Sequence, residues 1–511
     1  MAQAFFAREG DLFLRSILPL SLLGASLPCL HSTRSLSSLL WGSRFGQCFL
    51  LRFCGILEEE LPDGEGRPYL LLPLLLGVAF GGLSVFFPYA LPVLLLLSGS
   101  AALFLRVPEL VLLLLALVLP FLGWLPHPTL LLTVGAIALE WVWLRKYRRG
   151  QRILFFGCTE FLVLLLGLLY LLAGLVGSGG ADGIRSGLCR MLLMFLFFPS
   201  ASLLLRKQWR ERLIMTVHLS GAVLSLLGVL QYFFTDMELQ WVDLNRFSFL
   251  EGRVGLSFGN PNILSVFLVL ILPLGVAEIF SKEERGCKRA LLTVSCLLEG
   301  CCLILTWSRG AWLGILIALP TLLLLCNGRS RMFLLLSGVP ALLLSPALPR
   351  EVLLRLGSIG NMADSSIRYR FYTWKGVWRM LWENPWGIGT GEAAFRRIYP
   401  AYAVSGTETV MHAHRLLLQV SVELGVPGAL VLLLLLLLLG LHTVCAAARL
   451  CGRARRDLLG ASCGILGVVV MGCFDYVWYH FGVFALFWVW FGLAVSAAAG
   501  EEQEERSAYE G

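Results

Sequence analysis

The sequence predicts an all-α, polytopic integral membrane protein with about 12–14 transmembrane helices and one large extracytoplasmic loop. Of the 511 residues, 58% are hydrophobic and only 14% are charged, whereas soluble domains carry roughly 25% charged residues. Apolar runs of about 20 residues, the length that crosses a bilayer as a helix, recur along the chain. Backbone groups in lipid must be paired internally, so these runs are predicted to be helices rather than open strands.

The first 66 residues are less regular than the rest. Residues 1–66 are predicted to form an N-terminal segment that is cytoplasmic or interfacial. Its apolar stretch at 35–57 is interrupted by Arg44 and Arg52, a pattern typical of an amphipathic helix lying in the membrane plane. Whether this segment spans the membrane or lies on it stays open.

Residues 67–499 are predicted to form the membrane domain, followed by an acidic cytoplasmic tail at 500–511. One pair among the first three runs, which are separated only by proline-containing turns, could instead form a re-entrant hairpin. The predicted spans lie near 69–88, 90–106, 109–125, 128–145, 153–176, 187–205, 213–232, 262–280, 290–306, 311–326, 332–348, 414–446, 459–476 and 481–499.

The loops between the runs predict the orientation. Cytoplasmic loops of membrane proteins carry an excess of lysine and arginine, and a cytoplasmic position for every strongly basic loop gives a consistent alternation of spans. Both termini are then cytoplasmic, and the protein is expected in the cytoplasmic (inner) membrane. The basic loops are 145–152, 206–212, 282–289, 327–331 and 449–456.

The net charge of +8 lies largely in these short loops, so it indicates membrane orientation and no nucleic-acid partner. The 14 cysteines lie in or beside apolar runs or in short loops, without a CxxC pair or a Cys/His cluster at metal-binding spacing. We interpret them as small hydrophobic residues. No Asp-x-Asp motif occurs, and we expect neither a metal nor a cofactor.

One polar stretch stands apart from the apolar runs. Residues 349–413 are rich in aromatic residues, glycine and arginine, and connections between adjacent helices are usually much shorter. The alternation of spans places this loop on the outer side. Several arginines also fall on that side, where the orientation rule does not require them, and costly charges near a bilayer are functional candidates. They are Arg246, Arg253, Arg309, Arg368 and Arg370.

Within the loop, aromatic residues recur at helical spacing over 368–383, which predicts a helix on the membrane surface. Pro385 and the alternating glycines that follow, up to Gly391, are expected to end this helix and turn the chain. The aromatic side chains, Trp374 among them, are suited to stack on sugar rings. They are equally suited to anchor the helix at the interface, and both interpretations stay open.

Three outer-side motifs each allow a structural and a functional interpretation. Arg253 precedes Asn260-Pro261-Asn262, a helix entry, and its side chain could simply reach lipid headgroups. Arg309 occupies a tight junction between two runs, where it could be an interfacial anchor. His414 lies at the start of a long run, where an isolated histidine is often structural.

Together these motifs resemble the O-antigen ligase/O-antigen polymerase superfamily of membrane glycosyltransferases. The resemblance covers roughly residues 213–447. It rests on Arg-x-Gly…Asn-Pro-Asn at 253–262, Ser-Arg-Gly at 308–310, Trp…Asn-Pro-x-Gly-x-Gly-x-Gly at 374–391 and Ala-His…Gln…Glu-x-Gly-x-x-Gly at 413–428.

The resemblance implies transfer or polymerisation of a glycan from a polyprenyl-pyrophosphate-linked donor, on the outer membrane face, to a glycan or lipid acceptor. It implies that Arg253 and Arg309 hold the pyrophosphate and that His414 activates the acceptor hydroxyl. The family's histidine is usually followed by asparagine, but Arg415 stands here, which leaves ligase and polymerase both open. The substrate-binding candidates are Arg253, Arg309, Arg368, Arg370 and Trp374.

The alternative function is a transporter or flippase without glycosyl transfer. Transport through the membrane would favour ionisable residues in the middle of spans. The runs hold few of them, and this scarcity favours chemistry at the surface. The main exceptions are Glu160, His218, Glu299 and Glu423.

Overall fold

The computed structural model describes residues 107–148, 157–235, 252–281, 286–343, 350–358, 365–404 and 406–510. Residues Val111–Gly511 form one compact unit, and the following account concerns this unit. The predicted N-terminal segment, the spans at 69–88 and 90–106, and Arg246 lie outside the described residues. Every regular element in the described part of the chain is a helix, which confirms the predicted all-α class.

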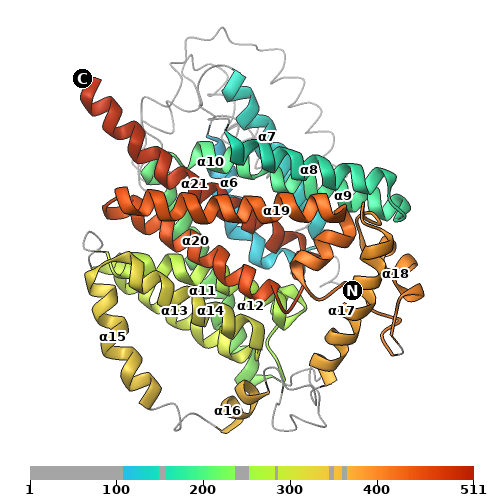
Figure 1. Ribbon diagram of the computed structural model, residues 1–511. Helices are drawn as coiled ribbons and strands as arrows, with labels where there is room; N and C mark the ends of the chain where they lie inside the picture. The colour runs from blue at the N-terminus through green and yellow to red at the C-terminus, as the bar shows by residue number, and fades with distance from the viewer. Residues whose placement is uncertain are drawn as a thin grey trace, which may run out of the picture. The chain divides into compact units, whose positions relative to one another are not determined.

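The helices follow one another along the chain as Figure 1 shows. They are α6 (Pro108–Val118), η3 (Leu119–Trp124), α7 (Pro128–Arg148), α8 (Cys158–Val176), α9 (Gly180–Phe195), α10 (Phe197–Leu203), α11 (Lys207–Phe234), η5 (Leu256–Phe258), α12 (Pro261–Ile279), α13 (Cys287–Leu305), α14 (Arg309–Cys326), α15 (Gly328–Leu343), α16 (Arg350–Gly357), α17 (Ser365–Glu383), α18 (Glu392–Ile398), η7 (Tyr399–Ala401), α19 (Leu416–Arg449), α20 (Gly452–Gly472) and α21 (Phe481–Glu510).

Eight described helical segments are long and apolar enough to cross a membrane: α7, α8, α9 with α10, α11, α12, α14, α19 and α21. Four further predicted spans correspond to the shorter segment Pro108–Trp124, to the 16-residue α15, and to α13 and α20, which carry several charged residues. The polytopic architecture is confirmed, and the predicted total also counts the two spans outside the described residues.

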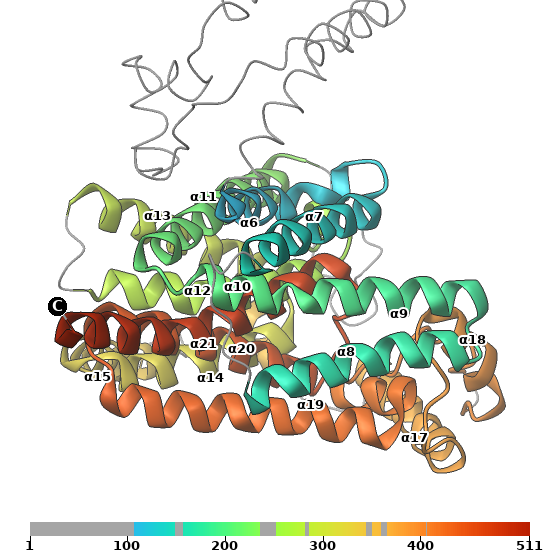
Figure 2. The same ribbon diagram turned by 90° about the horizontal axis from the view of Figure 1, so that it is seen from above.

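Helix α12 forms the centre of the bundle, because nearly its whole length is buried against α13, α14 and α20 (Figure 1). Close approach depends on small residues, as is usual between membrane helices. A β-carbon at Gly464 of α20 would lie 2.2 Å from the carbonyl oxygen of Leu270 in α12. On the other side of the bundle, α8 packs against α9 and α19 (Figure 2).

The charges of α20 are paired at one end of the bundle. Arg210 Nε lies 2.8 Å from Asp457 Oδ2, with both side chains buried, and Arg456 Nε lies 3.2 Å from Glu278 Oε1. Asn327 Nδ2 donates to the carbonyl oxygen of Phe280 at the same end. The described parts of the basic loops after α10, α12, α14 and α19 therefore meet on one side, as predicted; which face of the membrane this is stays a prediction.

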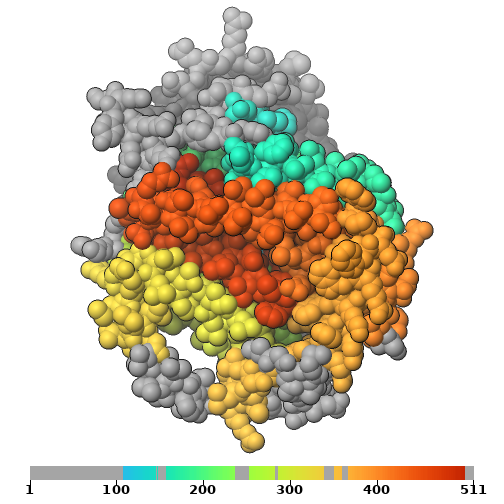
Figure 3. All heavy atoms as spheres, viewed as in Figure 1, coloured from blue at the N-terminus to red at the C-terminus, as the bar shows by residue number. Residues whose placement is uncertain are grey.

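The large loop contains the predicted helix, α17, which is not among the candidate spans. The orange surface at one end of α19 in Figure 3 belongs to α17 and the residues that follow it. Phe395 and Tyr399 stack in a buried cluster with Val377 and Met380 of α17. The loop is thus a packed layer with its own core.

The glycine-rich stretch after α17 runs extended against a break in α19. Ile388 N donates to Val422 O at 2.8 Å and Gly389 N to Glu423 O at 3.2 Å. Gly425 interrupts α19 with φ 75°, and a β-carbon at Gly387 would lie 2.6 Å from Gly425 N. The predicted turn is confirmed. The glycine-rich stretch after α17 and the glycine break of α19 fit closely against each other, and we call them the interlocking glycine motifs. The long span predicted from residue 414 is confirmed as α19, which begins at Leu416; its interruption at Gly425 was not predicted.

Candidate active site

A cavity of about 910 Å³ lies where η5, α17, the start of α19 and the α20–α21 connection meet. Segments far apart in sequence supply its wall, because the polar connections of several helices open at this same end. Its polar lining includes Arg253, Asn262, Arg370, His412, His414 and Asp475.

A narrow recess adjoins this cavity and shares Arg253, Asn262, Arg370 and Asp475 with it. Arg309 and Arg355 line the recess. The three residues predicted to be catalytic therefore come together: Arg253 and His414 line the main cavity, and Arg309 lines the recess beside Arg253.

The guanidinium of Arg253 is fixed by two helix ends. Its Nε donates to Thr306 O at the end of α13 (2.9 Å), and its Nη2 donates to Asn262 Oδ1 in the first turn of α12 (2.8 Å). Asn260 caps α12 by accepting a hydrogen bond from Asn262 N. The Asn-Pro-Asn motif thus begins the helix and also orients the arginine.

Arg309 is the first residue of α14, directly after the Ser308 N-cap. Its Nη1 donates to Ser358 Oγ at 2.7 Å, and Ser358 Oγ donates to Arg355 O. Arg355 donates to the carbonyl oxygen of Trp307 over 3.4 Å. Sequence reasoning missed Arg355, although its place near the start of the large loop was a usable signal.

His414 pairs with Asp475, a residue that the sequence analysis did not single out. His414 Nδ1 lies 3.2 Å from Asp475 Oδ1. Asp475 Oδ2 accepts hydrogen bonds from Asn262 Nδ2 (2.7 Å) and Arg370 Nη2 (3.4 Å). Burial opposes the charged carboxylate, but Arg370 and His414 outweigh it and hold the pKa of Asp475 below its usual range.

The arginines form a concentrated positive charge. Burial, followed by repulsion from Arg355 and Arg370 and a smaller contribution from Arg309, lowers the pKa of Arg253 to about 9. Such a cluster is costly until an anion enters, because like charges in a partly dehydrated site repel strongly. Arginine binds phosphate oxygens bidentately, so the site suits a polyanion.

His412 lines the same cavity but has a different electrostatic environment. Its ring stacks on Tyr479, with centroids 5.1 Å apart and the planes 17° from parallel. Burial, together with the neighbouring His414, lowers the pKa of His412 to about 3. His412 is therefore neutral near pH 7, and its Nδ1 accepts from His414 N.

The backbone is strained at two of these positions. Trp307 (φ 52°) and His414 (φ 48°) are non-glycine residues with left-handed conformation, which costs of order 1–3 kcal/mol for each residue. Hydrogen bonds from Trp307 N to Ile304 O and from His414 N to His412 Nδ1 help to hold them. Strain of this kind concentrates at functional sites.

A buried hydrogen-bond chain supports the backbone before His414. Gln419 Oε1 accepts from Ala413 N at 2.6 Å, and Gln419 Nε2 donates to Glu423 Oε1 at 2.8 Å. Glu423 Oε2 in turn accepts from Arg190 Nη1 of α9 at 2.7 Å. Gln419 thus contacts the polypeptide next to the histidine and not its ring.

The same chain returns to the carboxylate. Arg190 Nη2 donates to the hydroxyl of Tyr476 at 2.9 Å, and Tyr476 N donates to Asp475 Oδ1 at 2.9 Å. A closed ring of hydrogen bonds and short backbone links therefore joins His414 to Asp475 from both sides. We call it the Arg190 ring; it includes Ala413, His414, Gln419, Glu423, Asp475, Tyr476 and Arg190.

The remaining predicted residues lie in different places. Arg370 lines both cavities, whereas Arg368 is exposed and is not among the lining residues. Trp374 packs against the loop cluster, with the Arg415 guanidinium 5.5 Å from its ring centroid. Arg415, which stands where the family usually has asparagine, thus packs on an aromatic ring.

His412, His414 and Asp475 offer three ligand atoms within 4.8 Å of one another, so these residues are the candidate metal ligands of the cavity. Imidazole and carboxylate together are suited to divalent transition metals. Arg370 occupies one side of the carboxylate, however, and the neighbouring arginines repel a further cation. The charge of the site therefore favours anions over metals.

Comparison with known proteins supplies one match. Residues 293–433 match the family model described as O-antigen ligase, a range that includes Arg309, the interlocking glycine motifs and His414. No curated protein matches the chain. The match confirms the predicted resemblance: in residues 293–433 the chain carries the sequence signature of the O-antigen ligase/polymerase superfamily.

Proposed function

We propose that this protein is an O-antigen ligase/polymerase-like glycosyltransferase of cell-surface polysaccharide synthesis. It transfers a glycan from a polyprenyl-pyrophosphate-linked donor on the outer face of the cytoplasmic membrane. The observation that carries the proposal is the meeting of Arg253, Arg309 and Arg370 with the His414–Asp475 pair at one cavity.

The donor's pyrophosphate lies against the arginines in this proposal. Breaking the bond between the sugar C1 and the phosphate oxygen leaves its electron pair, and a negative charge, on the departing polyprenyl pyrophosphate. Guanidinium groups fixed in place before the reaction stabilise that charge without reorganising, usually the largest catalytic contribution. Arg253 is fixed in this way by Thr306 and Asn262.

The acceptor hydroxyl is activated by His414. Asp475 accepts a hydrogen bond from Nδ1–H of His414, which fixes the tautomer and leaves Nε2 as the base. The acceptor oxygen forms the new bond to C1, and its proton passes to Nε2 of His414. Both a glycan hydroxyl and a lipid-linked glycan hydroxyl satisfy this chemistry, so ligase and polymerase remain alternatives within the proposal.

The main ionisable residues within predicted spans do not favour transport. Glu423 is bound by Arg190, and Glu299 by His218. Glu160 caps the start of its own helix by accepting from Gly157 N. Each of these carboxylates is bound by a neighbouring group of the protein. In the described chain they therefore have structural partners and do not support a proton or ion path.

A deletion strain complemented with variants tests the function. Loss of the gene should cause lipid-linked glycan to accumulate: single repeat units for a polymerase, long chains for a ligase. Wild-type protein should reverse this and Arg309→Ala should not. Arg379→Ala is the matched control, because Arg379 is an exposed arginine of α17 outside both cavities. Unchanged lipid-linked and surface glycans in the deletion strain would contradict the proposal.

A further inference from the structure

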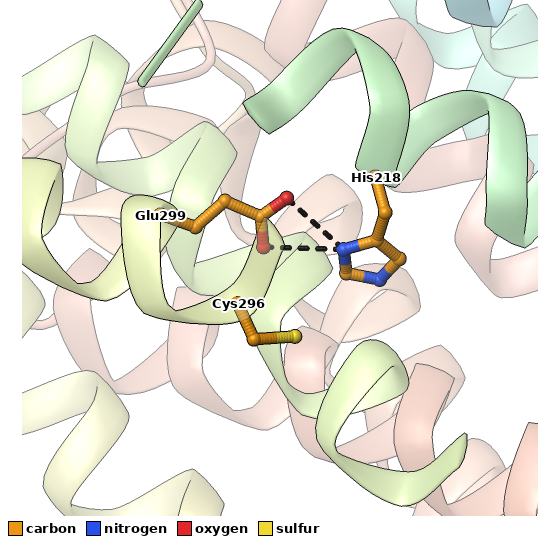
Figure 4. Close-up of side chains that lie close together, drawn as sticks. All are labelled: His218, Cys296 and Glu299. Carbon is orange, nitrogen blue, oxygen red and sulfur yellow. Dashed lines mark hydrogen bonds and ion pairs between the residues drawn. The ribbon is translucent and has the colours of Figure 1, made fainter. Parts of the chain in front are cut away.

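A second group of reactive side chains lies inside the helix bundle, away from the cavity. His218 of α11 faces Cys296 and Glu299 of α13 (Figure 4). All three residues are buried, and one ligand atom from each lies within 4.8 Å of the other two. No residue of this cluster belongs to the proposed transfer site.

The cluster joins two helices through its imidazole. His218 Nδ1 lies 3.0 Å and 3.1 Å from the two oxygens of Glu299. Two ligands of one Zn²⁺ at a tetrahedral angle lie about 3.3 Å apart, as follows from metal–ligand bonds of about 2.0–2.1 Å. The observed separations therefore fit a hydrogen-bonded pair and also fit two ligands of a shared ion.

Gly275 of α12 packs closely against the imidazole and the thiol. A β-carbon at Gly275 would lie 2.4 Å from His218 Cε1 and 2.6 Å from Cys296 Sγ. The absence of a side chain there lets α12 close over the cluster without displacing either group. We assign the ion to His218 Nδ1, because this nitrogen faces Glu299.

The charges of the three side chains indicate which kind of ion fits the cluster. In the apolar centre of the bundle an uncompensated charge is expensive. A thiolate from Cys296 and the Glu299 carboxylate together carry two negative charges, and neutral His218 adds none. A divalent cation makes the complex neutral, and the combination of sulfur, nitrogen and oxygen ligands is characteristic of zinc.

We propose that His218, Cys296 and Glu299 form a structural Zn²⁺ site that ties α11 to α13, which pack directly against each other. Binding releases the Cys296 proton, and no redox change is involved. Structural zinc sites have four ligands, and the second Glu299 oxygen, 3.1 Å from His218 Nδ1, supplies the fourth. The site is independent of the proposed glycosyl transfer.

Metal analysis of the full-length protein, purified in detergent with Zn²⁺ and freed of loose ions by gel filtration, tests the site. We expect about one Zn²⁺ per chain, falling to background in Cys296→Ser and His218→Ala. Cys302→Ser is the matched control, because Cys302 is buried in the same helix but lies outside the cluster. Cobalt added in place of zinc should give a thiolate-to-metal absorption band that Cys296→Ser lacks.

Thermal unfolding distinguishes zinc from a simple His–Glu pair. A chelator should lower the melting temperature of the wild type and of Cys302→Ser and leave that of Cys296→Ser unchanged. Cys296→Ser is nearly isosteric, so it tests the site even if His218→Ala fails to fold. Background zinc in the wild type, or equal zinc in wild type and Cys296→Ser, would overturn the proposal.

Discussion

The imidazole of His414 and the carboxylate of Asp475 pair across 61 residues of chain, with Nδ1 3.2 Å from Oδ1. Asp475 lies in the connection between α20 and α21, beyond the segment that matches the family model. The last two helices are therefore part of the candidate site, because they position the carboxylate against the histidine.

This pairing predicts that the loss of either side chain lowers turnover. Replacing His414 by Ala should lower turnover by roughly 10²-fold or more while donor binding persists, because only the base is lost. Asp475→Asn should also reduce turnover, since an amide does not fix the required tautomer. Glu408→Gln, an exposed carboxylate nearby, is the control. Transfer assays with purified protein and lipid-linked donor measure both effects; full activity of His414→Ala would remove its assigned role.

The arginine cluster predicts a pH dependence of anion binding. The pKa of Arg253 is lowered from its ordinary 12.5 to about 9, so its charge declines as the pH rises through about 9. Inorganic pyrophosphate should therefore raise the melting temperature strongly near pH 7.5 and progressively less toward about pH 10. This trend is the one that remains after the titration of pyrophosphate itself is subtracted. Arg253→Ala should show a smaller and flatter response than Arg379→Ala.

The stability of the unliganded protein should change in the opposite direction. Above about pH 9 the folded state has released a proton from Arg253 that the unfolded chain still holds. Stability rises with pH wherever the unfolded state binds more protons, so this residue's unfavourable contribution to folding declines between about pH 9 and 12. The difference in melting temperature between wild type and Arg253→Ala, measured across the accessible part of that range, reports the sign.

The close packing at Gly425 predicts that alanine substitutions at two glycines of α19 differ strongly in their effect on stability. Gly425 has φ 75°, and a β-carbon there would lie 2.6 Å from the backbone of Trp386. Gly425→Ala should therefore cost at least about 1–3 kcal/mol through backbone strain alone. Gly440 of the same helix has no neighbour within 4 Å of such a β-carbon, so Gly440→Ala should leave the melting temperature nearly unchanged. Equal melting temperatures for both variants would contradict the interlock.

Sequence periodicity and motifs predicted the helical class, most span positions and the meeting of Arg253, Arg309 and His414. These predictions succeeded because a bilayer imposes long apolar runs and because the polar motifs stand out against those runs. The break in α19 at Gly425 was not predicted, because the apolar pattern continues past this residue; only the packing against Trp386 reveals the break.

Asp475, Arg190 and Arg355 escaped prediction for a related reason. Asp475 and Arg190 are single polar residues in or beside apolar runs, with no local pattern that indicates a partner. The position of Arg355 in the large loop does not indicate which groups it contacts. The partner of Arg190, Glu423, is 233 residues away, and tertiary packing alone brings them together. Glu423 and Glu299, two ionisable residues within predicted spans, are thus explained by partners on other helices.

The orientation of the bundle remains a prediction that cysteine labelling can test. Ser330 is a poor reporter because it is buried, whereas Arg329 and Glu408 are exposed. In a cysteine-free background, an impermeant thiol reagent applied outside should label a cysteine at position 408 and not one at position 329. Permeabilised cells should label both. Labelling of position 329 alone from outside would reverse the assigned sides.

The Arg190–Glu423 pair predicts strong energetic coupling. Both side chains are buried, so removing one partner leaves an isolated charge and should cost about 3–5 kcal/mol. Arg190→Met combined with Glu423→Met should cost clearly less than the sum of the single changes, because neither charge then remains unpaired.

The same pair should influence catalysis through the Arg190 ring. Loss of Arg190 frees the hydroxyl of Tyr476 and the end of the Gln419–Glu423 chain, so His414 and Asp475 lose support on both sides. We expect the turnover number to fall more than the apparent affinity for donor. Arg190→Lys should rescue poorly, because an ammonium does not reproduce the two-sided contact.

Unfolding measurements in detergent and transfer assays on the same preparations separate the effect on stability from the effect on catalysis. Additive unfolding free energies, within about 0.5 kcal/mol, would exclude the coupling. Unchanged turnover in a folded Arg190→Met variant would exclude the positioning role.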